Sequence, residues 1–159
     1  MNVDFRENFF DESNYTYVRD YSRAATYTWG ESDLVNTPPT GMIHNIPEDE
    51  PIHELLRGTL EQTFPFVKDL KLIRMYINCF APQENPYFHE DGPSGVTFIL
   101  YLNDRWDPQA GGETQFFIDG NIYGIAPVAN RILLFPANVL HRATTLRHEH
   151  RFTIAIKYE

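Results

Sequence analysis

The chain of 159 residues has a single cysteine, few basic residues and no long apolar run. Cys79 has no second cysteine with which to form an internal disulfide, which favours a reducing compartment such as the cytoplasm. No segment approaches the ~20 apolar residues that cross a bilayer, and no basic stretch followed by an apolar one marks a signal peptide at the N-terminus. We therefore expect a cytoplasmic protein without a membrane partner.

Basic residues are outnumbered, with 13 Lys and Arg against 22 Asp and Glu and a net charge of −9. Proteins that bind a phosphate backbone normally carry a basic face. The composition therefore disfavours nucleic acid as the main partner, although a local basic patch around Arg142, Arg147 and Arg151 stays open.

Internal repeats and low-complexity tracts are also missing, so the length predicts one domain over residues 1–159. A hydrophobic content of 42% and an aromatic content of 14% are sufficient for a buried core and argue against disorder. The sequence leaves the oligomeric state open.

The N-terminal part, residues 1–65, is rich in aromatic side chains and has little clear periodicity. Short strands are expected at residues 15–18 and 25–29, because aromatic and β-branched residues suit a pleated surface. Residues 49–64 have apolar side chains at three- and four-residue steps, and Pro51 stands where a first helical turn tolerates it. This pattern predicts a helix that covers one face of a sheet.

From residue 68 onward the period of the apolar side chains changes to two, as in half-buried strands. Asp119-Gly120 is a hairpin signal, and Asn130 tolerates the positive φ of a tight turn. The expected strands are residues 71–80, 96–102, 115–118, 122–125, 131–135 and 152–158. These elements predict a mainly β fold with a flanking helix (α+β), in which a jelly-roll double sheet occupies residues 66–159.

His89 and Asp91 are two residues apart, so in extended backbone both point to the same face while Glu90 points away. His141 follows the expected strand at 131–135, which could lie beside the segment that carries His89. Two imidazoles and one carboxylate can occupy one face of Fe(II) and leave the other face open. The alternative is an ordinary surface ion pair without a metal, since a lone His-x-Asp pair is common.

Arg151 lies at the start of the last strand, where a guanidinium could hold the far carboxylate of a dicarboxylic acid with two hydrogen bonds. Arg147 competes for this role, but it lies in an expected loop, where a solvated charge is the usual case. The remaining histidines are interpreted as ordinary polar residues: His44 and His53 facing solvent, and His148 and His150 at the rim of a turn.

Blocks between residues 70 and 158 resemble the Fe(II)- and 2-oxoglutarate-dependent dioxygenases, in particular their prolyl-hydroxylase-like branch. The order of the blocks makes the resemblance specific, since no single block is decisive. The blocks are Tyr76–Phe80, His89–Asp91, Thr97–Asn103, Gly111–Phe117, Arg131–Pro136 with His141, and Arg151–Ile156.

The resemblance implies a double-stranded β-helix core and an iron held by His89, Asp91 and His141. It implies that Arg151 pairs with the C5 carboxylate of 2-oxoglutarate. Tyr101 matches a tyrosine whose hydroxyl helps bind that carboxylate, and Thr114 falls where such enzymes line the cosubstrate pocket. For both of these residues the alternative is simple packing on a strand.

Two positions depart from the pattern of the oxygen-sensing prolyl hydroxylases. Phe80 replaces a tyrosine, and Tyr76 or Asn78 on the same strand face could supply the lost hydrogen bond to the cosubstrate. Lys157 stands in place of a bulky tryptophan, so it could change the pocket floor or reach toward solvent. With these two departures, the resemblance does not identify the substrate.

The resemblance thus implies a hydroxylase that decarboxylates 2-oxoglutarate to succinate and uses Fe(II) and O₂, with ascorbate as a candidate reductant. The expected substrate is a prolyl or other residue of a peptide or protein. The alternatives are a small-molecule hydroxylase acting on a free amino acid, and a non-catalytic metal-binding barrel. Repair of alkylated nucleic acid by the same chemistry is disfavoured by the acidic charge.

Overall fold

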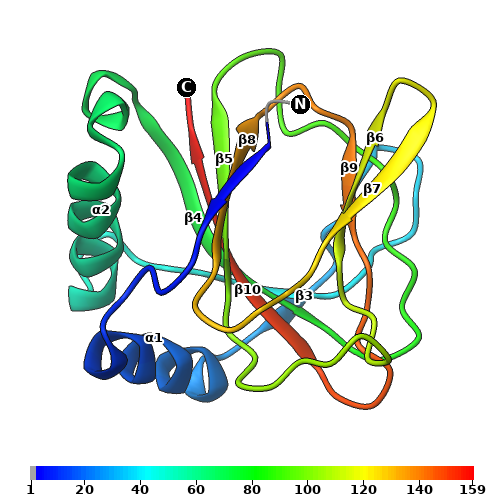
Figure 1. Cartoon of the computed structure of the whole chain (residues 1–159), viewed down its shortest axis with the longest axis horizontal. Coiled ribbons are helices and arrows are strands. Elements are labelled where there is room, and N and C mark those ends of the chain that lie inside the picture. Colours follow the sequence, from blue (N-terminus) through cyan, green and yellow to red (C-terminus); the bar gives the residue numbers. More distant parts are fainter. Residues whose placement is uncertain (1–2) are drawn as a thin grey trace.

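The computed structural model describes residues 3–159, and within them two antiparallel sheets are flanked on one side by two helices (Figure 1). The larger sheet has the order β1-β8-β5-β10-β4-β3-β2, and the smaller one the order β7-β6-β9. The strands of the larger sheet are β1 (Asp4–Arg6), β2 (Thr28–Trp29), β3 (Met42–Asn45), β4 (Leu72–Phe80), β5 (Val96–Tyr101), β8 (Ile132–Pro136) and β10 (Arg151–Tyr158). Those of the smaller sheet are β6 (Thr114–Ile118), β7 (Asn121–Ile125) and β9 (His141–Ala143). The prediction of a mainly β, antiparallel double-sheet fold is confirmed.

Strand β10 lies at the centre of the larger sheet, paired on one side with β4 and on the other with β5. Its side chains alternate between two environments, as the period of two requires. Ile154 and Ile156 join the core cluster under the helices, while Thr153 and Ala155 line a cavity on the opposite face. One strand therefore contributes both to the core and to the wall of the candidate site.

The turn predictions are confirmed. Asp119 and Gly120 have φ angles of 49° and 77°, the left-handed conformation of both central residues in a tight hairpin of β6 and β7. Asn130 has a φ of 60°, and its side chain exchanges hydrogen bonds with the backbone of Phe10. The turn before β8 is thereby tied to the N-terminal segment.

Helix α2 (Pro51–Thr63) confirms the predicted helix, and a short 3-10 helix (Pro65–Asp69) follows it. Ile52, Leu56 and Leu60 are fully buried against the larger sheet. His53 is also buried, at 7% exposure, so the expectation that it faces solvent is wrong. His44 also departs from the expectation of a residue that faces solvent, because its two ring nitrogens contact the Tyr21 hydroxyl and the Thr26 carbonyl.

Helix α1 (Glu12–Ala24) corrects the expectation of a strand at residues 15–18. Asp11 is the N-cap, and its carboxylate accepts a hydrogen bond of 2.8 Å from the backbone N–H of Asn14. Val18 and Ser22, four residues apart, are fully buried, so the helix packs one face onto the core. Aromatic β-propensity is a weak preference that tertiary packing overrides here.

Replacing Asp11 with alanine should lower the free energy of unfolding by about 1 kcal/mol, because the first turn of α1 loses its side-chain acceptor. Chemical denaturation followed by circular dichroism measures this change. Asp11→Asn keeps a capping side chain and should retain most of the stability. Equal losses in both variants would show that the cap is not the cause.

Neither helix within residues 3–159 is long and apolar enough to cross a membrane.

Candidate functional site

Main-chain hydrogen bonds bring the first and last of the three candidate ligands side by side. His89 and His141 form an antiparallel bridge in which the N–H of each donates to the carbonyl of the other, at 2.9 and 3.0 Å. Two residues further, the N–H of Asp91 donates to the carbonyl of Ala137 at 2.8 Å. The expectation that the segments carrying His89 and His141 are neighbours is therefore confirmed, although His89 lies in an isolated bridge instead of a regular strand.

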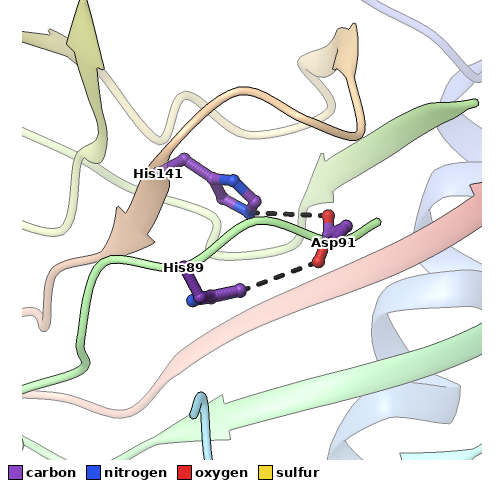
Figure 2. Close-up of side chains that lie close together, drawn as sticks. All are labelled: His89, Asp91 and His141. Atoms are coloured by element: carbon purple, nitrogen blue, oxygen red, sulfur yellow. Dashed lines mark ion pairs between the residues drawn. The ribbon is translucent and has the colours of Figure 1, made fainter. Parts of the chain in front are cut away.

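The three side chains converge on one point (Figure 2). The Nε2 atoms of His141 and His89 lie 3.5 and 3.7 Å from the two carboxylate oxygens of Asp91, and all three ligand atoms fall within 4.8 Å of one another. These separations are too long for hydrogen bonds, yet short enough for one ion to contact all three residues. The arrangement fits a 2-His-1-carboxylate metal site.

Each imidazole is held in the tautomer that a metal ligand needs. Nδ1 of His89 lies 3.0 Å from the carbonyl of Tyr87, and Nδ1 of His141 lies 2.8 Å from the carbonyl of Val139. Because a carbonyl only accepts, Nδ1 carries a proton, so in the neutral ring Nε2 is the nitrogen with the free lone pair. Burial lowers the pKa of His141, which favours the neutral, coordinating form.

Asp91 stays ionised although its side chain is only 3% exposed. Burial opposes ionisation, but the nearby imidazole of His141, the charge and hydrogen bond of Lys157 and the hydrogen bond from Thr97 outweigh it, so the pKa of Asp91 is lowered. The Thr97 hydroxyl donates to Oδ2 at 2.6 Å, and the ammonium of Lys157 lies 2.7 Å from Oδ1. Both carboxylate oxygens thus have a donor of their own.

Arg151 is the largest fully buried side chain, and it has no ion-pair partner among residues 3–159. Its Nε donates to the carbonyl of Gly112 and its Nη2 to the hydroxyl of Thr114, each at 2.9 Å. Burial lowers its pKa, yet a guanidinium remains charged in proteins. A buried charge without a counter-ion is costly, so this position is suited to an anionic ligand.

Thr114 and Tyr101 stand next to this guanidinium. The Tyr101 hydroxyl donates to Oγ1 of Thr114 at 2.6 Å, and Oγ1 also accepts from Arg151. Because Thr114 accepts both bonds, its own proton is left for a further acceptor. Tyr101 is buried behind Thr114 and is absent from the cavity wall, so it reaches the cavity only through its neighbour.

A single cavity of about 160 Å³ joins the His89, Asp91 and His141 cluster to the buried guanidinium of Arg151. Thr114, Tyr76 and Asn78 also line it, as do Phe80 and Lys157, the two departures from the prolyl-hydroxylase pattern. Burial raises the pKa of Tyr76, and the nearby Lys157 ammonium opposes that rise.

Other sequence candidates lie away from this cavity. Arg147 is exposed and donates to the carbonyl of Gln109, and His148 and His150 are exposed too. A surface patch that includes Arg151 is not formed, because Arg151 is buried. The sequence reasoning missed the contact of Lys157 with Asp91, although the alternation of β10 places Lys157 on the same face as Arg151.

Comparisons with known proteins identify the family of this chain. The family model described as the 2OG-Fe(II) oxygenase superfamily matches residues 76–158. A search of curated proteins finds no match.

Several solved structures share the fold. A prolyl hydroxylase from Trichoplax adhaerens, in complex with a hypoxia inducible factor oxygen degradation domain peptide, is 19% identical with a TM-score of 0.78, covering 99% of this chain and 83% of that one. A prolyl-4-hydroxylase from Pseudomonas putida is 18% identical with a TM-score of 0.76, covering 99% and 92%. HygX from Streptomyces hygroscopicus, with nickel, 2-oxoglutarate and hygromycin B bound, is 13% identical with a TM-score of 0.76, covering 99% and 82%.

Proposed function

Because the chain belongs to the 2OG-Fe(II) oxygenase superfamily, and is a dioxygenase of a family that uses Fe(II), 2-oxoglutarate and O₂, we propose that it hydroxylates a prolyl or other residue of a peptide or protein. The proposed iron ligands are His89, Asp91 and His141. Arg151 is the proposed partner of the C5 carboxylate of 2-oxoglutarate. One observation carries the proposal: a metal-ligating cluster and a buried guanidinium that has no counter-ion within residues 3–159 lie in the wall of the same cavity.

When bound, iron and 2-oxoglutarate would supply the oxidising chemistry, in which decarboxylation to succinate accompanies C–H hydroxylation. The chain itself supplies two imidazoles whose Nδ1 atoms are bonded to carbonyls, an ionised carboxylate and a cation that receives the cosubstrate. Thr114 offers a hydroxyl proton beside Arg151, and Tyr101 supports Thr114 from behind. Tyr76 and Asn78 are proposed as further polar contacts, since both line the cavity next to Phe80.

The size of the cavity supports a substrate that inserts only one side chain. Pockets that enclose a drug-sized ligand measure about 300–1,000 Å³, whereas this one measures about 160 Å³. A cosubstrate bound between the metal and Arg151 would leave little of that volume for a second molecule. A peptide could lie across the opening and present one residue, in agreement with the shared fold of prolyl hydroxylases.

A small-molecule hydroxylase is the second candidate, favoured by the same fold in HygX with hygromycin B bound. A non-catalytic barrel is the third. It is disfavoured because the site retains the buried guanidinium of Arg151 in addition to the three metal-ligating side chains. Binding of a metal alone does not need that guanidinium.

The test is incubation with Fe(II), 2-oxoglutarate and air, with ascorbate as the proposed reductant, against a proline-containing peptide library and a set of free amino acids. We expect succinate to form with peptides, together with product peptides heavier by one oxygen atom. Turnover of free amino acids alone would favour the small-molecule candidate. Binding of 2-oxoglutarate without stimulated turnover by any compound would favour the non-catalytic barrel.

A further inference from the structure

Lys157 places a positive charge directly against the proposed iron ligand Asp91. The ammonium extends from β10 into the cavity, its side chain is 22% exposed, and Nζ lies 2.7 Å from Oδ1 of Asp91. Thr97 donates to the other oxygen, Oδ2, at 2.6 Å. Before any metal binds, the carboxylate is therefore held from both sides.

Glu31, another acidic residue of this cavity, already has a cationic partner. Both carboxylate oxygens of Glu31 accept from the Arg74 guanidinium at 2.7 Å. Arg74 also lies 4.0 Å from the centre of the Tyr76 ring. Within residues 3–159, Asp91 is the one acidic group that forms an ion pair with Lys157.

A carboxylate can bind a metal through one oxygen or through two. The 2-His-1-carboxylate arrangement is useful because three protein ligands leave open positions on the metal. A second bond from Asp91 would occupy one of the positions that 2-oxoglutarate needs. The positive charge of an ammonium on one carboxylate oxygen disfavours a bond from that oxygen to a metal cation, whereas the neutral Thr97 hydroxyl on the other oxygen carries no such repulsion.

We propose that Lys157 is a positioning residue that keeps Asp91 bound to the metal through a single oxygen and so preserves a coordination position for 2-oxoglutarate. The inference rests on the proposed function, because it takes Asp91 as a metal ligand. It also has a second consequence. A cation beside the ligand repels a divalent ion and withdraws electron density from the carboxylate, so Lys157 weakens metal binding while it strengthens cosubstrate binding.

The test compares the wild-type protein with Lys157→Met. Metal affinity is measured by anaerobic titration with Fe(II) and, separately, with Mn(II). Affinity for 2-oxoglutarate is then measured on the Fe(II)-saturated protein by the visible absorption band of the complex. We expect Lys157→Met to bind metal about 10-fold more tightly, and 2-oxoglutarate about 10-fold more weakly or worse, in line with the size of effects from groups that contact a ligand.

Two further variants sharpen the test. Lys157→Arg can still donate to Asp91 and should return both affinities toward wild type. Lys68→Met removes the same charge from an exposed position outside the cavity, and should behave like wild type. If thermal melting shows that Lys157→Met does not fold, Lys157→Gln removes the charge with a side chain of similar polarity and takes its place.

Opposite changes in the two affinities support the proposal, since a residue with only a structural role would weaken both together. A fall in both affinities, no change in either, or tighter metal binding with unaltered 2-oxoglutarate binding would each overturn it. Failure of the wild-type protein to bind metal or 2-oxoglutarate would instead contradict the proposed function, so the two failures are distinguishable.

Discussion

Replacing Arg151 with methionine should weaken 2-oxoglutarate binding by ~30-fold to several-thousand-fold, the equivalent of about 2–5 kcal/mol. Arg151 is 1% exposed and has no counter-ion among residues 3–159, so a cosubstrate carboxylate would be its partner in a dry environment. Methionine retains much of the length and apolar character of the side chain but removes the charge. Metal affinity should change little, because Arg151 contacts none of the three candidate ligands.

The measurement is an anaerobic titration of the Fe(II)-loaded variant with 2-oxoglutarate, followed by the visible absorption band. Arg147→Met is the matched control, since Arg147 is exposed and its guanidinium donates to the carbonyl of Gln109. Thermal melting shows whether the loss of the bonds to Gly112 and Thr114 has unfolded the variant. Unaltered cosubstrate affinity in a folded Arg151→Met protein would assign the carboxylate to another residue.

The second large effect is expected from His141→Ala, which removes one of the three proposed metal ligands. Changing a group that only supports a ligand typically costs about 10–100-fold in metal affinity, and the loss of a ligand itself should exceed that range. The His141 ring is 5% exposed, and Nδ1 is already bonded to Val139, so the variant also leaves a cavity beside Phe135. Because 2-oxoglutarate would bind through the metal, its binding should be lost when metal binding is lost.

Thermal shift with Mn(II) provides a direct readout. A bound ion at about 100 times its dissociation constant stabilises the folded state by about 2.7 kcal/mol, so wild type should melt at a higher temperature with Mn(II) and His141→Ala should not. His150→Ala is the control, because His150 is exposed. A normal metal-dependent shift in a folded His141→Ala protein would mean that the ion binds elsewhere.

The strands of the core could be predicted because alternation with period two is strong from β4 to β10 and because two turns carry residues that tolerate positive φ. Helix α1 could not be predicted in the same way. Its tyrosines and valine have high β-propensity, and the choice between helix and strand depends on packing against distant strands. Asp11 was the available signal, since it is a favourable N-cap residue.

The candidate metal ligands could be predicted from residue types and spacing, whereas their surroundings could not. The carbonyls of Tyr87 and Val139, which fix both tautomers, belong to the main chain and carry no side-chain signal. Lys157 was recognised as a departure from the prolyl-hydroxylase pattern, but its direction stayed open between the pocket floor and solvent. The structure turns it into the cavity, where it meets Asp91.

The reciprocal bridge between His89 and His141 has a consequence for protein engineering. Because both bonds join backbone atoms, the spacing of the two main-chain segments that carry the histidines does not depend on the identity of the surrounding side chains. Residues such as Phe80 and Ile43, which line the cavity from other strands, can therefore be exchanged to redesign selectivity without dismantling the scaffold that places the histidines. Directed evolution of this chain would best begin with libraries at those positions.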